Sequence, residues 1–414
     1  MVVLGIFLSL VFLVSLVSKR AQKTIITAPV IFTLAGILLV LTVSEFSQVE
    51  IKGHNILVIG EIALAVVLFT DATRISLRQV TRESQLPARL LGIGMPLTIL
   101  AGMVVAVLLI SDLTVWEAAI LATILAPTDA SLGAAVVNSR LVPARIRQAL
   151  SVESGLNDGL SIPLLMLFIA LAKVESPGDD TSWIVFTVQQ IGFGLLVGLA
   201  LGWVGGRLMA NADRRSWMTK AAQQLALLSL AILSWWLAEK VVGGNGFIAA
   251  FIAGSMIKYS FDSAHERMAD FDEVWGDMLT YFIFFLFGAI AAPFLGAITG
   301  LLWLYALLSL TLVRMLPVAI ALIGTRLQRA SVLFLGWFGP RGLASIVLGL
   351  IFLEEKTNLA GEAIIQMALI ATVLLSIFAH GISAYPAINK YAQQVQSMGP
   401  DAPEKQEPTP AKNF

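Results

Sequence analysis

Two carboxylates, one hydroxyl and one amide lie close together in the run Glu153-Ser154-Gly155-Leu156-Asn157-Asp158-Gly159. The surrounding stretch, about 148 to 171, is otherwise apolar and long enough for a helix that crosses a bilayer, which needs roughly 20 residues. At about 100° per residue, Glu153 and Asn157 share one stripe of that helix, and Ser154 and Asp158 share the next. A charge deep in a membrane span is costly, so these acids are expected to face a cavity or a partner and to serve a function.

The composition indicates a polytopic membrane protein. Of the 414 residues, 57% are hydrophobic and only 13% are charged, values outside the usual range of soluble domains. The chain has no cysteine, which excludes disulfides, thiol catalysis and cysteine metal sites. The first apolar segment lacks a basic flank and a cleavage signal, and it is therefore expected to be a retained span.

About thirteen apolar segments predict an all-α protein with about 13 transmembrane helices. Most of the 27 Lys and Arg fall on one side of this arrangement if the N-terminus is outside, so the C-terminus is expected in the cytoplasm. Residues 1–390 form the predicted transmembrane domain, and the polar, proline-containing residues 391–414 are expected to be a short disordered cytoplasmic tail. The segments lie at about 2 to 18, 25 to 44, 54 to 71, 90 to 111, 115 to 138, 148 to 171, 183 to 206, 219 to 239, 245 to 257, 275 to 294, 299 to 324, 330 to 353 and 362 to 386.

Two of these spans contain helix breakers halfway across. In the fifth, Pro127 is followed by Thr128 and Asp129, and in the twelfth, Gly339-Pro340-Arg341-Gly342 interrupts the run. Paired interruptions in the two halves of a membrane protein are typical of a transporter's binding site. The two spans are seven apart and run in opposite directions, which predicts two inverted six-helix repeats, about 1–172 and 219–390, with crossed broken helices and a connector helix at about 183–206.

The polar residues of these two regions suit a small, hard cation. Asp158 and Asp129 offer anionic oxygens, and Ser154 and Thr128 add neutral ones, a set that favours Na+ or Li+ over soft metals. Asp129 is expected at the start of a new half-helix, whose positive end supports a carboxylate. A carboxylate in a poorly solvated cavity holds either a proton or a cation near neutral pH. Mutually exclusive occupancy of one acid would drive cation and proton in opposite directions.

Glu153 would be a third buried anion and needs a countercharge. Arg314, which lies in the middle of the eleventh span, is one candidate, and Arg341 is the other. The sequence does not choose between them. Asn157 is expected to hydrogen-bond Glu153 and the loosened backbone of the fifth span.

At these residues the chain resembles the monovalent cation/proton antiporters of the NhaP and sodium/proton exchanger type, which form the first branch of the cation/proton antiporter superfamily. The resemblance covers about residues 1 to 390. It is carried by Thr128-Asp129, by Glu153-Ser154 with Asn157-Asp158, by Arg314 and by Gly339-Pro340-Arg341-Gly342. One departure is Ala130, where family members often have proline.

The resemblance implies a homodimer in which a core bundle with the crossed spans moves against a dimerisation scaffold. It implies that Asp158 is the shared proton and cation ligand, helped by Asp129, Ser154 and Thr128, with Glu153 bridged to an arginine. The electrogenic branch carries two adjacent aspartates where this chain has only Asp158, so electroneutral 1:1 exchange is the family expectation. The long regulatory C-terminal domain of animal exchangers is missing, which favours a bacterial-type protein of the inner membrane.

The expected function is therefore exchange of Na+ or Li+ for H+ by alternating access, without a cofactor, in a chain that is not an enzyme. A K+/H+ antiporter is the main alternative, because cavity size and ligand number decide selectivity. An intramembrane aspartyl protease is a remote one, since the chain lacks the Gly-x-Gly-Asp pattern of such enzymes. A passive channel is disfavoured because no filter signature is visible.

Overall fold

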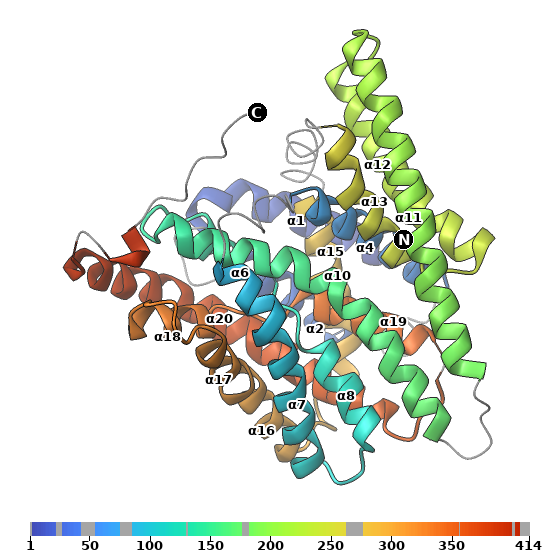
Figure 1. Cartoon of the computed structure of the whole chain (residues 1–414). Coiled ribbons are helices and arrows are strands. Elements are labelled where there is room, and N and C mark those ends of the chain that lie inside the picture. The colour runs from blue at the N-terminus through green and yellow to red at the C-terminus, as the bar shows by residue number, and fades with distance from the viewer. Residues whose placement is uncertain are drawn as a thin grey trace. The chain divides into compact units, whose positions relative to one another are not determined.

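The computed structural model describes residues 2–21, 27–42, 54–74, 85–129, 131–175, 182–261, 276–355, 357–399 and 402–405. All regular elements within these residues are helices (Figure 1). The chain divides into two compact units. Unit 1 comprises Met1–Ile51, Gln79–Asn157 and Thr280–Phe414, and unit 2 comprises Lys52–Arg78 and Asp158–Leu279.

Unit 1 contains both predicted helix breaks. Its elements are α1 (Val2–Ala21), α2 (Ala28–Thr42), α6 (Gln85–Arg89), η1 (Leu90–Gly94), α7 (Met95–Leu109), α8 (Val115–Ile124), α9 (Ala134–Val137), the first part of α10 (Ala144–Glu175), most of α15 (Asp277–Ala291), η4 (Ala292–Phe294), α16 (Gly300–Leu310), α17 (Leu312–Ala321), α18 (Arg329–Trp337), α19 (Leu343–Glu354), α20 (Glu362–Ser397) and η5 (Pro403–Lys405).

Unit 2 contains the rest of α10 and five further elements. They are α4 (His54–Arg74), α11 (Ser182–Arg214), α12 (Lys220–Trp236), η2 (Leu237–Val242) and α13 (Gly246–Ser260). Glycines on one face of α11 let it approach α13 closely, because a Cβ added at Gly194, Gly198 or Gly202 would lie 2.6 Å from a backbone oxygen of the facing segment. Such a stripe of small residues is a common way for membrane helices to pack.

Each predicted apolar segment falls on one helix or on consecutive helices. Seven stretches of the described residues are long and apolar enough to cross a membrane, and five shorter helices are apolar as well. The chain is thus a membrane protein with several spans. The seven long stretches are Gln85–Leu109, Ala144–Val174, Val185–Arg214, Lys220–Val242, Asp277–Phe294, Gly300–Ala321 and Glu362–Ser397.

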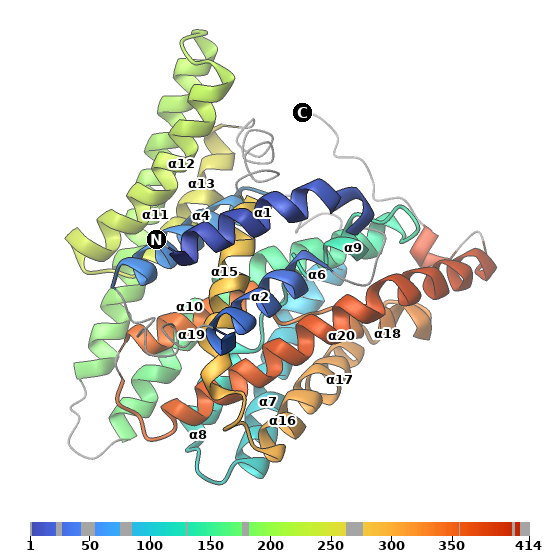
Figure 2. The ribbon, with the colours of Figure 1, turned by 180° about the vertical axis from the view of Figure 1, so that it is seen from behind.

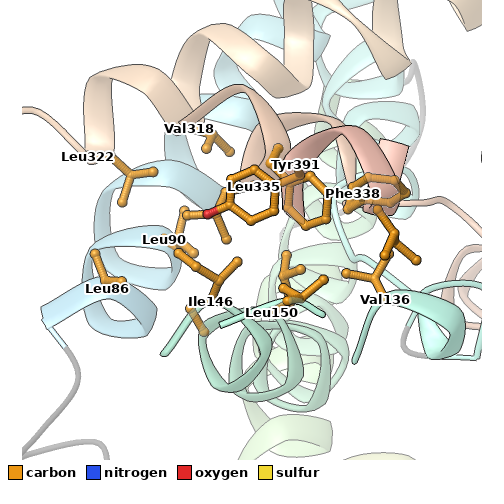
Figure 3. Packing of buried hydrophobic residues seen from close by; sticks show 14 of the residues in the cluster. Leu86, Leu90, Val136, Ile146, Leu150, Val318, Leu322, Leu335, Phe338 and Tyr391 are labelled. Carbon is orange, nitrogen blue, oxygen red and sulfur yellow. The ribbon is translucent and has the colours of Figure 1, made fainter. Parts of the chain in front are cut away.

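The apolar core of unit 1 lies where α18 packs against α17 and α20 (Figures 1 and 2). Its side chains also come from α6, η1, α9 and α10, and Figure 3 shows them interdigitating around the ring of Tyr391. That ring stacks on Phe334 with the centroids 4.2 Å apart. The packing fixes α18, the first half of the broken twelfth span, against the start of α10. The labelled members are Leu86, Leu90, Val136, Ile146, Leu150, Val318, Leu322, Leu335, Phe338 and Tyr391.

Helix α20 extends beyond residue 390, the predicted end of the transmembrane domain. Helix α20 continues to Ser397, seven residues beyond Lys390, because Tyr391 and its neighbours pack into the core of unit 1. Residues Pro403–Lys405 then form a 3-10 turn, in which Glu404 is only 1% exposed. Residues 406–414 lie outside the described part of the chain.

The eleventh span contains a bend that the sequence did not predict. It is divided at Thr311, between α16 and α17. The Thr311 hydroxyl donates to the Leu307 carbonyl oxygen at 2.7 Å, and such side-chain bonds to the preceding turn often bend helices. Arg314 therefore lies in the first turn of α17 rather than in the middle of a straight helix.

Candidate functional site

The two helix breaks lie against each other, and each one caps a helix of the other span. Asp129, in the break after α8, accepts a hydrogen bond from the Leu343 amide at 2.7 Å, at the first residue of α19. The Asp129 amide in turn donates to the Pro340 carbonyl oxygen at 2.8 Å. The carboxylate also neutralises the positive end of α19. Asp129 also begins the helical turn of its own span that leads to α9, because the Gly133 amide donates to its carbonyl oxygen at 3.1 Å and the Ser131 amide to Oδ1 at 2.7 Å, although α9 itself begins only at Ala134.

Arg341 makes the reciprocal contact. Its Nη1 donates to the carbonyl oxygens of Ala126 and Pro127, the latter at 3.0 Å. These carbonyls follow the end of α8, where the helix no longer supplies amide donors. The guanidinium is 0% exposed, and its charge complements the negative end of α8. Arg341 thus braces the end of α8 in the fifth span.

Glu153 pairs with Arg314, which resolves the choice left open by the sequence. Nη1 of Arg314 lies 2.6 Å from Oε1 of Glu153, and Nη2 lies 2.9 Å from Oε2. Both side chains are buried. Two parallel charge-assisted hydrogen bonds of this kind fix direction as well as distance. The pair joins α10 to α17 beside Gly339, whose lack of a side chain leaves room for the guanidinium.

Three neutral polar side chains connect α10 to the break after α8. The Thr128 hydroxyl accepts a hydrogen bond from Nδ2 of Asn157 at 2.8 Å and lies 3.2 Å from the Ser154 hydroxyl. Ser154 donates to the Leu150 carbonyl oxygen at 3.0 Å, so its oxygen remains an acceptor for Thr128. Asn157 thus contacts the fifth span through the Thr128 hydroxyl.

Asp158 follows Asn157 directly on α10 and is the first residue of unit 2. It is partly exposed, whereas Glu153, Ser154 and Asn157 are buried. Within unit 2, Gly159 packs against the ring of Phe251 on α13 so closely that an added Cβ would lie 2.4 Å from it. This contact fixes the rotation of α10 next to Asp158.

Ser131 is a part of the site that the sequence analysis missed. Its amide and its hydroxyl donate to Oδ1 of Asp129 at 2.7 and 2.6 Å. The signal was present, because an aspartate followed two positions later by serine is typical of an Asx turn. With the Leu343 amide on Oδ2, both oxygens of Asp129 accept hydrogen bonds from protein groups. Ala130 lies outside the described residues.

Within the described residues, no group of three or more His, Asp or Glu side chains is placed to hold a metal ion. The oxygens gathered at the crossing are instead mainly hydroxyl, amide and backbone oxygens beside single carboxylates. Such a set of oxygens can bind a monovalent cation transiently.

The fold and the crossed breaks define a membrane transport protein. Residues 7–390 match the family described as sodium/hydrogen exchanger, transmembrane, and the chain belongs to this family. The structure is similar to that of the sodium proton antiporter MjNhaP1 from Methanocaldococcus jannaschii, with a TM-score of 0.77 and 22% identity over 96% of this chain and 99% of that one. At this identity the likeness shows the fold.

Curated relatives match at similar identity. A probable Na+/H+ antiporter of Schizosaccharomyces pombe is 24% identical over 60% of this chain and 34% of its own length. The K+/H+ antiporter NhaP of Alkalimonas amylolytica is 24% identical over 83% of this chain and 59% of its own length. The chain therefore spans about a third to three fifths of the length of these relatives.

Proposed function

We propose that this protein exchanges Na+ or Li+ for protons across a membrane by alternating access, with Asp158 as the acid that binds either ion. The observation that supports this best is the polar cluster one helical turn before Asp158 on α10. There the Ser154 hydroxyl lies 3.2 Å from the Thr128 hydroxyl of the unwound fifth span, which accepts a hydrogen bond from Nδ2 of Asn157. Glu153, on the same helix, is neutralised by Arg314.

The proposed cation ligands are Asp158, Ser154, Thr128 and Asp129. Ser154 precedes Asp158 by one helical turn on α10, so the hydroxyl and the carboxylate share a stripe of the helix. The contact between Thr128 and Ser154 adds the oxygens of the unwound fifth span to the same stripe. For Asp129, ligation is proposed in addition to its cap on α19, because Oδ2 accepts from the Leu343 amide and a carboxylate oxygen has two lone pairs.

Competition between proton and cation for one carboxylate gives coupled exchange. The carboxylate binds Na+ only after losing its proton, and one charge replaces another, which supports an electroneutral 1:1 cycle. The proposal further includes about thirteen spans in two inverted repeats, a homodimer, an inner membrane location, an external N-terminus and a cytoplasmic C-terminus. The same proposal makes the chain a transporter rather than an enzyme.

Potassium is the second candidate ion. The relative that aligns over 83% of this chain is described as a K+/H+ antiporter, and the oxygen ligands proposed here do not by themselves exclude a larger ion. The two candidates differ in which ion drives proton movement, and not in the role of Asp158.

The test is a proteoliposome assay that follows internal pH while Na+, Li+ or K+ is added, with and without an imposed voltage. We expect Na+ and Li+ to drive proton movement that does not depend on voltage. The D158N variant should lose exchange and remain folded, whereas D112N, which changes an exposed acid, should match the wild type. Exchange at the wild-type rate in D158N would refute the assignment, and a response to K+ alone would select the second candidate.

A further inference from the structure

A polar stripe on α20 lies against the break of the twelfth span. Ser376, His380 and Ser383 are spaced by four and three positions and therefore share one face of the helix. Their partners lie at the two ends of the break between α18 and α19, namely Trp337 and Arg341. All of these residues belong to unit 1.

Each member of the stripe satisfies a polar group at the break. Nε2 of His380 lies 2.8 Å from the carbonyl oxygen of Trp337, the last residue of α18. The Ser376 hydroxyl accepts a hydrogen bond from the Arg341 amide at 2.7 Å. Nε1 of the Trp337 indole donates to the Ser383 hydroxyl at 2.9 Å. Groups freed by unwinding a helix inside a membrane need such partners.

His380 occupies the centre of this arrangement and is 1% exposed. Its ring stacks on the Trp337 indole, with the centroids 5.0 Å apart. Because the Trp337 carbonyl only accepts, Nε2 carries a proton as long as this bond exists. On the other side, Nδ1 lies 2.9 Å from the Ser376 carbonyl oxygen and 3.2 Å from the Ser376 hydroxyl. In the neutral ring, Nδ1 can accept from the Ser376 hydroxyl, and in the charged ring it can donate to the Ser376 carbonyl. The bond from Nε2 to Trp337 is therefore compatible with both charge states of His380.

We propose that His380 is a positioning residue for cation binding, which holds the two ends of the twelfth-span break at the spacing that Arg341 needs. This inference rests on the proposed function. His380 fixes the end of α18 through Trp337 and orients Ser376, which fixes the Arg341 amide. Arg341 then holds the carbonyls of Ala126 and Pro127, next to the proposed ligand Thr128.

The expected consequence is a change in cation affinity rather than in proton binding. Displacing the break moves the oxygens of Thr128 and Asp129, whereas Asp158 lies on α10 and keeps its proton chemistry. The charged groups that act on His380 are the guanidiniums of Arg341 and Arg314.

Three variants and a control test this role in proteoliposomes. H380L removes one of two donors to the Trp337 carbonyl oxygen, the other being the Gly339 amide. H380Q supplies an amide donor in its place, and S376A removes the acceptor of the Arg341 amide. The control is T372V on the same helix, because Thr372 is fully buried and, among the described residues, its hydroxyl bonds the Ala368 carbonyl oxygen of α20 itself.

We expect H380L and S376A to raise the half-saturating Na+ or Li+ concentration about tenfold, the size expected when a buried polar group loses its partner. The maximal rate per folded carrier should stay within about twofold, H380Q should restore most of the affinity, and the pH profile should not move. Hydrogen exchange of the peptide over residues 338–343 should be faster in H380L and S376A than in T372V.

Equal cation affinities in H380L, S376A and T372V would overturn the inference. A shifted pH profile in H380Q would overturn it as well, because His380 would then act through its own proton. If H380L does not fold, S376A and H380Q decide on the same criteria. If the wild type exchanges no cation, the proposed function fails, while the hydrogen-exchange comparison still tests whether the stripe holds the break.

Discussion

The buried pair of Glu153 and Arg314 allows a quantitative test of how unit 1 is held together. Both side chains are about 2% exposed, and two hydrogen bonds of 2.6 and 2.9 Å join them. Removing one partner of such a pair costs about 3–5 kcal/mol, mostly because the other charge stays buried without compensation. We expect R314M and E153Q each to lower the free energy of unfolding by that amount, which raises the equilibrium constant of unfolding by about two to four powers of ten.

The decisive variant is the double replacement E153M/R314M. It removes both charges and leaves side chains of similar volume, so its cost should be about 1–2 kcal/mol at most, well below the sum of the single variants. The free energy of unfolding would be measured in mixed micelles for the wild type, the two single variants and the double variant. R140M, which changes an exposed arginine, is the control and should stay within about 0.5 kcal/mol of the wild type.

Additive costs would refute this reasoning. If the double variant lost as much free energy as the two single variants together, Glu153 and Arg314 would not compensate each other's charge. Loss of exchange in R314M at unchanged stability would also contradict it, because the pair would then act on transport directly.

Three further substitutions test the contacts around this core. E404A should lower the unfolding free energy by about 1–3 kcal/mol, because buried Glu404 accepts from the amide of Gln328 at the start of α18; thermal unfolding of E404A and of the control E354A, which changes an exposed glutamate, would measure the difference. G36A should cost more than about 1 kcal/mol, since an added Cβ would lie 2.0 Å from the Phe285 carbonyl oxygen, and equal stability of G36A and the wild type would contradict this packing. D129N should keep more stability than D129A, because it retains one acceptor oxygen for the helix cap; the two would be compared by the same unfolding assay.

The positions of the two breaks could be predicted because their cause is local. Proline and glycine remove or loosen backbone hydrogen bonds wherever they occur, and the structure confirms that α8 ends at Ile124 and α18 ends at Trp337. The short range of this signal also explains the miss at Thr311. A threonine bends a helix only when its hydroxyl competes for the preceding turn, which residue type alone does not reveal.

The partners across the crossing could not be predicted, because they depend on residues far apart in the sequence. Asp129 and Leu343 are separated by 214 positions, and nothing in either stretch specifies which helix end the carboxylate caps. The choice between Arg314 and Arg341 was open for the same reason, since both are long, charged and buried. The C-terminal end of α20 was missed for a different reason. Loss of hydrophobicity after Lys390 marks where a segment can leave the membrane, but a helix continues while a residue such as Tyr391 still packs against the core.

The opposite charges of Asp129 and Arg341 explain how two unwound helices can share one place inside a membrane. An unwound span exposes a helix C-terminus with free carbonyls and a helix N-terminus with free amides, and each end carries a partial charge. Arg341 donates to the carbonyls at the end of α8 in the fifth span, and Asp129 accepts from the amide at the start of α19 in the twelfth. The two formal charges therefore balance each other, and each also neutralises the partial charge of the helix end that it contacts. Because Glu153 and Arg314 cancel in the same way, the crossing has no net charge of its own.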